Sequence, residues 1–93
     1  MKIDEAMRKF RLPNPASQED LEGRWNNVLV FGDRVLMAGY YYNGDEPSYF
    51  AAVYEFLTHD TTCEGPIGLM SVSDLEFEDN GHAIAWAIEE AKK

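Results

Sequence analysis

Hydrophobic residues recur with a helical period at the two ends of the chain and with a strand period between them. The first apolar residues fall at i, i+3, i+4 and i+7, which is one stripe of a helix: Ile3, Ala6, Met7 and Phe10. Pro13 disfavours helical geometry in the residue before it, so we expect this helix to end near Leu12. We expect the helix to lie on a sheet with Arg8, Lys9 and Arg11 in solvent. The alternative is an arm offered to a partner.

A second, shorter helical signal follows. Ser17 and Asp20 are spaced as in a capping box, with Asp in place of the usual Glu. They predict a helical turn that ends at Gly23, a residue able to adopt the left-handed cap conformation. Trp25 comes next, and we expect it to anchor this turn on the core.

Residues 27–57 predict consecutive antiparallel strands, which we expect to form the core of one sheet. Residues 27–31 (NVLVF) are apolar on both faces, and Gly32-Asp33 connects them to the next strand, residues 34–42. Gly in the first position of a two-residue connection is what a type II′ hairpin requires. Asn43-Gly44 is the next turn signal, and we expect this turn to extend through Ser48.

Residues 49–58 fit two structures. As a strand they alternate aromatic and β-branched residues, which suit a pleated surface. As a helix they also form an apolar stripe, and Pro47 would suit a helix start. The aromatic content favours a strand, while Ala51 and Ala52 count against it.

The rest of the chain predicts a polar loop, a strand, an acidic edge strand and a helix: 59–66, 67–72, 75–78 and 81–91. Asp79 or Asn80 can cap the helix. Together these elements predict an α+β fold in a single domain, residues 1–93. Its core is an antiparallel β-sheet of about four strands flanked by an N-terminal helix and a C-terminal helix.

Acidic and basic residues are distributed unevenly along the chain. The net charge is −9, and residues 35–91 contain eleven carboxylates and no Lys or Arg. Such a field repels nucleic acid and anionic membranes and attracts basic proteins. The simpler explanation is that an acidic surface keeps a small protein soluble.

The composition also predicts a location. No apolar run approaches the ~20 residues that span a bilayer, and the N-terminus lacks the apolar stretch of a signal peptide. The single cysteine, Cys63, fits a reducing compartment. We therefore expect a soluble, cytoplasmic protein.

Candidate chemistry is sparse. His59 and Cys63, four residues apart beside Asp60 and Glu64, are too few to predict a structural zinc site, which needs four ligands. There is no glycine-rich phosphate loop and no CxxC pair. We expect no enzymatic activity, no metal and no cofactor.

The tyrosines bear on nucleic-acid binding. All five lie in the part of the sequence that carries no positive charge: Tyr40, Tyr41, Tyr42, Tyr49 and Tyr54. A nucleic-acid surface would interleave basic residues with aromatic ones. Direct binding of nucleic acid is therefore not expected.

Two features point to a protein partner. Trp86 lies opposite the packing stripe of the last helix, so it is a candidate interface anchor, unless its ring folds over neighbouring surface. The strands are apolar on both faces, while two modest helices can be expected to cover only one. Loops, a partner or a second copy in a homodimer would then close the other face.

These observations predict a small, acidic, non-enzymatic module that occupies a basic surface on a nucleic-acid-processing protein. An inhibitor of the nucleic-acid-mimic, immunity or antitoxin type is its sharpest form. The alternative is a structural or regulatory homo-oligomer whose acidic surface serves only solubility. The candidate partner-binding residues are Asp45, Glu46, Asp74, Glu76, Glu78, Asp79, Trp86, Glu89 and Glu90.

Overall fold

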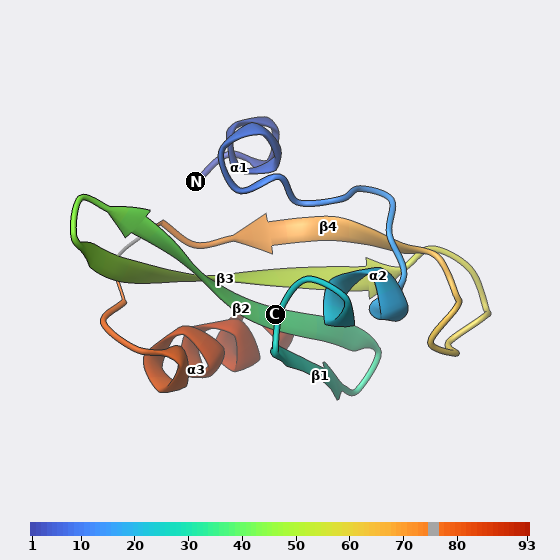
Figure 1. Ribbon diagram of the computed structural model, residues 1–93. Helices are drawn as coiled ribbons and strands as arrows, with labels where there is room; N and C mark the ends of the chain where they lie inside the picture. Colours follow the sequence, from blue (N-terminus) through green and yellow to red (C-terminus); the bar gives the residue numbers. More distant parts are fainter. Residues whose placement is uncertain (75–76) are drawn as a thin grey trace.

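The computed structural model describes residues 1–74 and 77–93, and within them it confirms the α+β fold, with a four-stranded antiparallel sheet between an N-terminal and a C-terminal helix (Figure 1). The bounds are α1 Ile3–Phe10, α2 Gln18–Glu22, β1 Asn27–Phe31, β2 Arg34–Asn43, β3 Glu46–Phe56, β4 Ile67–Val72 and α3 Asn80–Ala91. No helix in the described part of the chain has the length and apolar character to cross a membrane.

The strands follow one another in the order β1-β2-β3-β4, each antiparallel to its neighbour. Both tight hairpins have a glycine first, with φ of 63° at Gly32 and 80° at Gly44, where an L side chain would be strained. The expected extension of the second turn to Ser48 is wrong, because β2 and β3 stay paired up to Asn43 and Glu46. β4 pairs with residues 52–56 of β3. Pro47 therefore lies in a part of β3 that is not paired with β4, where its missing backbone N–H removes no hydrogen bond to that strand.

The ambiguous segment 49–58 is a strand, part of β3, as the aromatic content favoured. The two alanines that weighed against a strand are both fully buried. Ala52 belongs to the core beneath α1, and Ala51 belongs to the core beneath α3. Small side chains here let a helix approach each face of the sheet closely.

The helices lie on opposite faces of the sheet, with α1 above it and α3 below it in Figure 1. The core on the α1 face contains Phe10, Leu21, Met37, Phe50 and Tyr54 among its buried residues. The core on the α3 face contains Leu36, Ala38, Val53, Ala83 and Ala87. The expectation that both helices cover one face is therefore wrong, because α3 packs on the second face, although Tyr40 and Tyr42 of β2 stay exposed.

The first two helices end where the sequence predicts, α1 just before Leu12 with Arg11 as its C-cap, and α2 with Gly23 as its C-cap. Arg11, directly after α1, adopts the left-handed conformation with φ 55° and ψ 43°. The capping box of α2 is confirmed, since Ser17 Oγ accepts from Asp20 N at 3.2 Å and Asp20 accepts from Ser17 N at 3.0 Å. The left-handed cap expected at Gly23 is wrong. Its φ is −70°, because the backbone N–H groups of residues 23–25 still bond back to carbonyls within α2.

The chain between β4 and α3 returns to the sheet. Phe77 forms an isolated antiparallel bridge with Tyr49, with N···O distances of 2.9 and 3.3 Å. Leu75 and Glu76, half of the predicted edge strand, lie outside the described residues, and Glu78 is not in a strand. The predicted cap of the last helix is confirmed, because Asp79 Oδ1 accepts from His82 N at 2.8 Å.

The cap gives α3 a pH-dependent stability. Hydrogen bonds from the backbone N–H and then the imidazole of His82 hold the pKa of Asp79 below its ordinary value of 3.8. A lowered folded-state pKa means that this stabilisation is complete above the unfolded pKa and is lost as the pH falls through the folded value. We expect Asp79→Ala to lower the melting temperature at about pH 7 while Asp79→Asn, which can still cap, lowers it less.

Thermal unfolding of the three proteins at about pH 7 and about pH 2 tests this cap. The gap between the wild type and Asp79→Ala should shrink at the acidic pH. An equal gap at both pH values would show that the carboxylate charge does not contribute.

Candidate functional site

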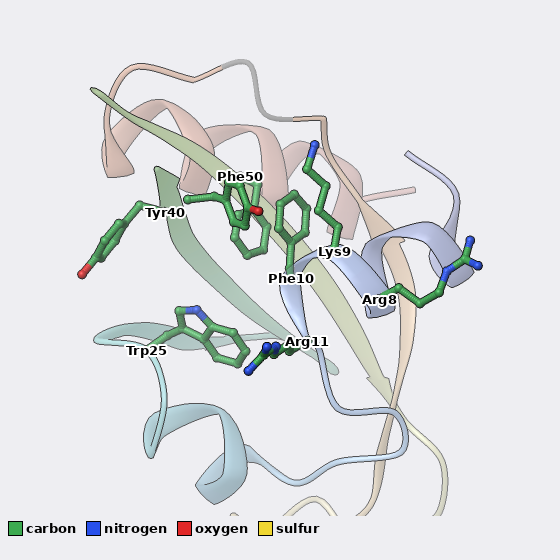
Figure 2. Close-up of a pocket in the computed structure, with 8 residues that line it drawn as sticks. Arg8, Lys9, Phe10, Arg11, Trp25, Tyr40 and Phe50 are labelled. Carbon is green, nitrogen blue, oxygen red and sulfur yellow. The ribbon is translucent and has the colours of Figure 1, made fainter. Parts of the chain in front are cut away.

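A pocket of about 500 Å³ opens between the end of α1, the chain after α2 and the strands β2 and β3 (Figure 2). We call it the basic–aromatic pocket, and its lining residues are Arg8, Lys9, Phe10, Arg11, Trp25, Tyr40, Tyr41 and Phe50. Three of these are basic and five are aromatic, and among the described residues no carboxylate lines it. Such a lining suits a ligand that is flat and negatively charged.

The basic side chains reach the pocket because α1 ends there. The left-handed turn at Arg11 stops the helix and turns the chain toward α2. Arg24 then fixes this corner, since its Nη1 donates to the carbonyl oxygen of Arg11 at 2.6 Å. The end of α1 and the end of α2 are thereby held as two neighbouring walls.

Stacked rings form the floor of the pocket. Phe10 and Phe50 lie parallel, with centroids 3.9 Å apart and planes 8° apart, and both are buried. Tyr41 meets Phe10 edge-on at 5.9 Å and is 41% exposed. Lys9 Nζ lies 5.8 Å from the ring centroids of both Phe10 and Tyr41, within the range of a cation–π contact. The floor is therefore rigid, with one ring and one ammonium group at the surface.

Trp25 forms the side wall, and Gly39 makes room for it. A Cβ atom at position 39 would lie 2.7 Å from Trp25 Nε1, closer than atoms can pack, and 3.0 Å from Phe50 Cε1, a tight contact. The Trp25 ring is half-buried, and the Arg24 guanidinium lies 5.9 Å from its centroid. As expected, Trp25 anchors the α2 turn on the core, because it packs against the residues beneath α1.

The three basic side chains are not equivalent. In Figure 2, Arg11 extends toward the indole of Trp25 and Lys9 runs beside Phe10, whereas Arg8 points away from the aromatic residues. None of the three forms an ion pair with a carboxylate of residues 1–74 or 77–93. Lys9 and Arg11 are therefore the positive charges that a ligand in this pocket would meet.

A smaller hollow of about 180 Å³ shares Trp25 and Tyr40 with the basic–aromatic pocket. Three asparagine residues also line it, Asn26, Asn27 and Asn80. Amides offer both donors and acceptors, so this hollow can contribute polar contacts to a ligand that stacks on Trp25.

The candidate acidic residues lie on separate elements. Asp45 and Glu46 are exposed at the tip of the β2–β3 hairpin. Asp74 pairs with the amino terminus of Met1 at 3.2 Å. Glu76 lies outside the described residues.

The remaining candidates lie at α3. Asp79 is occupied as the helix cap. Glu90 is half-buried, accepts from Ser71 Oγ at 3.2 Å, and pairs with Lys93, whose hydrogen bond holds the pKa of Glu90 below its ordinary value of 4.5. Among the candidates that the structure describes, Glu78, Trp86 and Glu89 come together in a groove described below.

The loop at residues 59–66 has no gathered ligand set. Cys63 is an exposed free thiol. Within the described part of the chain, no three His, Cys, Asp or Glu side chains are grouped as a metal site would require.

Sequence reasoning missed the basic–aromatic pocket. The tyrosines lie in a part of the sequence without Lys or Arg, so the sequence predicted no basic side chains beside them. The fold places Tyr41 of β2 beside Lys9 of α1, thirty-two residues earlier. The available signal was the run of residues 8–11 (RKFR), where a buried aromatic ring sits among basic side chains.

The structure thus shows a small α+β domain with a basic–aromatic pocket beside its sheet. Residues 12–91 match the family Nmad4, nucleotide modification associated domain 4, and the chain belongs to this family. The matched range includes Trp25, Tyr41 and Phe50 but begins just after Arg11. No curated protein and no solved structure matches the chain.

Proposed function

We propose that this protein binds a nucleotide in the basic–aromatic pocket, with the base stacked on Trp25 and the phosphate held by Lys9 and Arg11. One observation carries the proposal: two basic side chains without ion-pair partners among the described residues line the same pocket as an accessible indole ring. The family description, which refers to nucleotide modification, supports it without naming a ligand.

The chemistry of a nucleotide matches the two halves of the pocket. Every base has a flat π-face, and stacking one on an aromatic side chain is worth about 1–3 kcal/mol. The guanidinium of Arg11 can bind two phosphate oxygens at once, while Lys9 supplies a compact point charge. The amides of the smaller hollow are the groups that would contact the edge of the base.

The size and charge of the protein limit the ligand. A pocket of about 500 Å³ falls within the range of sites for single small molecules. The net charge of −9 repels an extended polyanion. We therefore favour one nucleotide, either free or unpaired within a short single strand, over a duplex.

We further propose that the protein binds without catalysing a reaction. The described lining of the pocket contains no Asp, Glu, His or Cys, and we assign its Lys and Tyr side chains to binding and not to acid–base or nucleophilic chemistry. The role is then to hold or present a nucleotide in the cytoplasm.

The inhibitor hypothesis drawn from the sequence stays a second proposal. It needs a continuous acidic surface, whereas the described candidates lie on separate elements, and Asp79 and Glu90 accept hydrogen bonds from the chain's own groups. The observation in its favour is the groove at α3, which keeps two of the predicted carboxylates exposed beside Trp86.

Arg11→Gly separates binding from stability. Glycine adopts the left-handed conformation of residue 11 without strain, so the free energy of unfolding should stay equal or rise by up to about 1 kcal/mol. Nucleotide affinity should nevertheless fall about tenfold, because one charge-assisted phosphate contact is lost. Isothermal titration calorimetry with the four deoxynucleoside 5′-monophosphates, together with urea unfolding, measures both quantities.

Lys2→Gln is the matched control, since Lys2 is exposed and lies outside the lining of the pocket, and its loss should change affinity less than about twofold. Three further ligands assign the contacts: the nucleosides, inorganic phosphate and a short single strand. Weaker binding of nucleosides and of phosphate than of monophosphates is expected. Unchanged affinity in Arg11→Gly, or no binding of any nucleotide by the wild type, would overturn the proposal.

A further inference from the structure

A second hollow lies along α3, and α3 covers the opposite face of the sheet from α1. We call it the α3 groove. Its volume is about 560 Å³, and its lining residues are Phe77, Glu78, His82, Ala85, Trp86 and Glu89. It shares no residue with the basic–aromatic pocket.

Two aromatic rings shape the α3 groove. The Phe77 and Trp86 centroids are 6.5 Å apart with an interplanar angle of 50°. Phe77 is held by its backbone bridge to Tyr49, and both rings pack partly against the core beneath α3. Trp86 is therefore half-buried, so one part of its surface stabilises the fold while another part lines the groove.

The charge of the α3 groove is negative. Glu78 and Glu89 are exposed at its walls, and no Lys or Arg lines it among the described residues. Glu89 forms an ion pair with Lys92, whose ammonium lies 3.4 Å from the carboxylate, and both side chains are more than half exposed. Lys92 would therefore compete with a cationic ligand for Glu89. Exposed pairs of this kind are weak, so a ligand cation can replace Lys92.

We propose that the α3 groove binds a lysine or arginine side chain presented by a cationic segment of a partner protein. The charged head would lie over the Trp86 ring with Glu78 and Glu89 beside it, and the aliphatic stem would lie on Phe77 and Ala85. Charge complementarity selects this occupant. A cation is attracted both by the face of an indole and by carboxylates, whereas nucleic acid and anionic lipid are repelled.

This surface is independent of the proposed nucleotide site. A nucleotide can occupy the α1 face while a basic partner is docked on the α3 face. The inference therefore does not depend on the proposed function. Of the acidic residues that the sequence offered as partner-binding candidates, it retains Glu78 and Glu89, and it also retains Trp86.

The two tryptophans allow both surfaces to be followed separately. Each indole N–H gives its own signal in a ¹⁵N-correlated NMR spectrum, one from Trp25 and one from Trp86. The probe is an acetylated six-residue peptide of alternating arginine and leucine, and the matched control peptide carries glutamate in place of arginine. We expect the arginine peptide to shift the Trp86 signal to saturation, to leave the Trp25 signal in place, and to bind more weakly at high salt.

The substitution test uses Glu78→Gln with Glu89→Gln. Both side chains are exposed, so the double variant should fold as the wild type does, and its dissociation constant for the arginine peptide should rise about tenfold. Asp45→Asn with Glu46→Gln removes the same charge from the hairpin tip and should change it less than about twofold.

The outcomes decide the proposal. A shift at Trp86 that is weakened only by the α3 double variant supports it. An unmoved Trp86 signal overturns it, as does equal weakening by the hairpin variant, which would show a response to net charge alone. Failure of the proposed function would appear elsewhere, as a Trp25 signal that does not respond to nucleotides.

Discussion

Phe10→Ala is expected to lower the free energy of unfolding by about 3–5 kcal/mol and to abolish nucleotide binding. Phe10 is 7% exposed and stacks on Phe50, which makes it the main apolar link between α1 and the sheet in this pocket. Removing the ring leaves a cavity that the rigid sheet cannot fill. It also loosens the last turn of α1, which carries Lys9 and leads into Arg11, the two residues proposed to bind the phosphate.

Urea unfolding and calorimetry with a monophosphate measure the two effects of Phe10→Ala. The matched control is Phe31→Ala, at the exposed end of β1, which should cost less than about 1 kcal/mol and leave binding intact. A Phe10→Ala protein that is as stable as the control would contradict the packing of α1 described above.

Gly39→Ala is expected to destabilise the fold by about 1–3 kcal/mol and to displace Trp25. The added Cβ would lie 2.7 Å from Trp25 Nε1 and 3.0 Å from Phe50, a buried ring that cannot move aside. The indole must therefore shift, and the side wall of the basic–aromatic pocket shifts with it. Tryptophan fluorescence should report the change in the surroundings of Trp25.

Gly23→Ala is the control for Gly39→Ala. Its added Cβ would meet only ordinary contacts of 3.5 Å and beyond, and its φ of −70° suits any L residue. Its stability should change by less than about 1 kcal/mol in either direction, and nucleotide affinity should be unchanged. Equal losses at the two positions would mean that Trp25 does not depend on the space above Gly39.

Local signals in the sequence predicted much of the fold. The apolar stripe of α1, the capping box of Ser17 and Asp20, and the cap at Asp79 act within a few residues, so spacing alone reveals them. The turn at Asn43-Gly44 was predicted, but it is shorter than expected. Residues 46–48 have a turn-like sequence and are nevertheless part of β3, because β2 and β3 stay paired as far as Asn43 and Glu46. The end of the second helix at Gly23 was predicted correctly, but Gly23 is not left-handed, since hydrogen bonds within the turn set its φ.

The candidate site could not be found in the same way. Lys9, Trp25 and Tyr41 belong to three different elements, and only the tertiary fold brings them into one pocket. Counting charge along the chain placed the tyrosines in an acidic half, while the left-handed turn at Arg11 folds the basic end of α1 onto them. Trp86 was recognised as an outward feature, and the structure shows it both packed and accessible.

The most direct test of the nucleotide site is a titration of the ¹⁵N-labelled protein with the four deoxynucleoside 5′-monophosphates, following the two indole N–H signals. The account predicts a saturable shift of the Trp25 signal for at least one nucleotide, no shift of Trp86, and a clearly weaker response in Arg11→Gly. A Trp25 signal that stays in place with all four nucleotides, or that responds equally in Arg11→Gly, would contradict it.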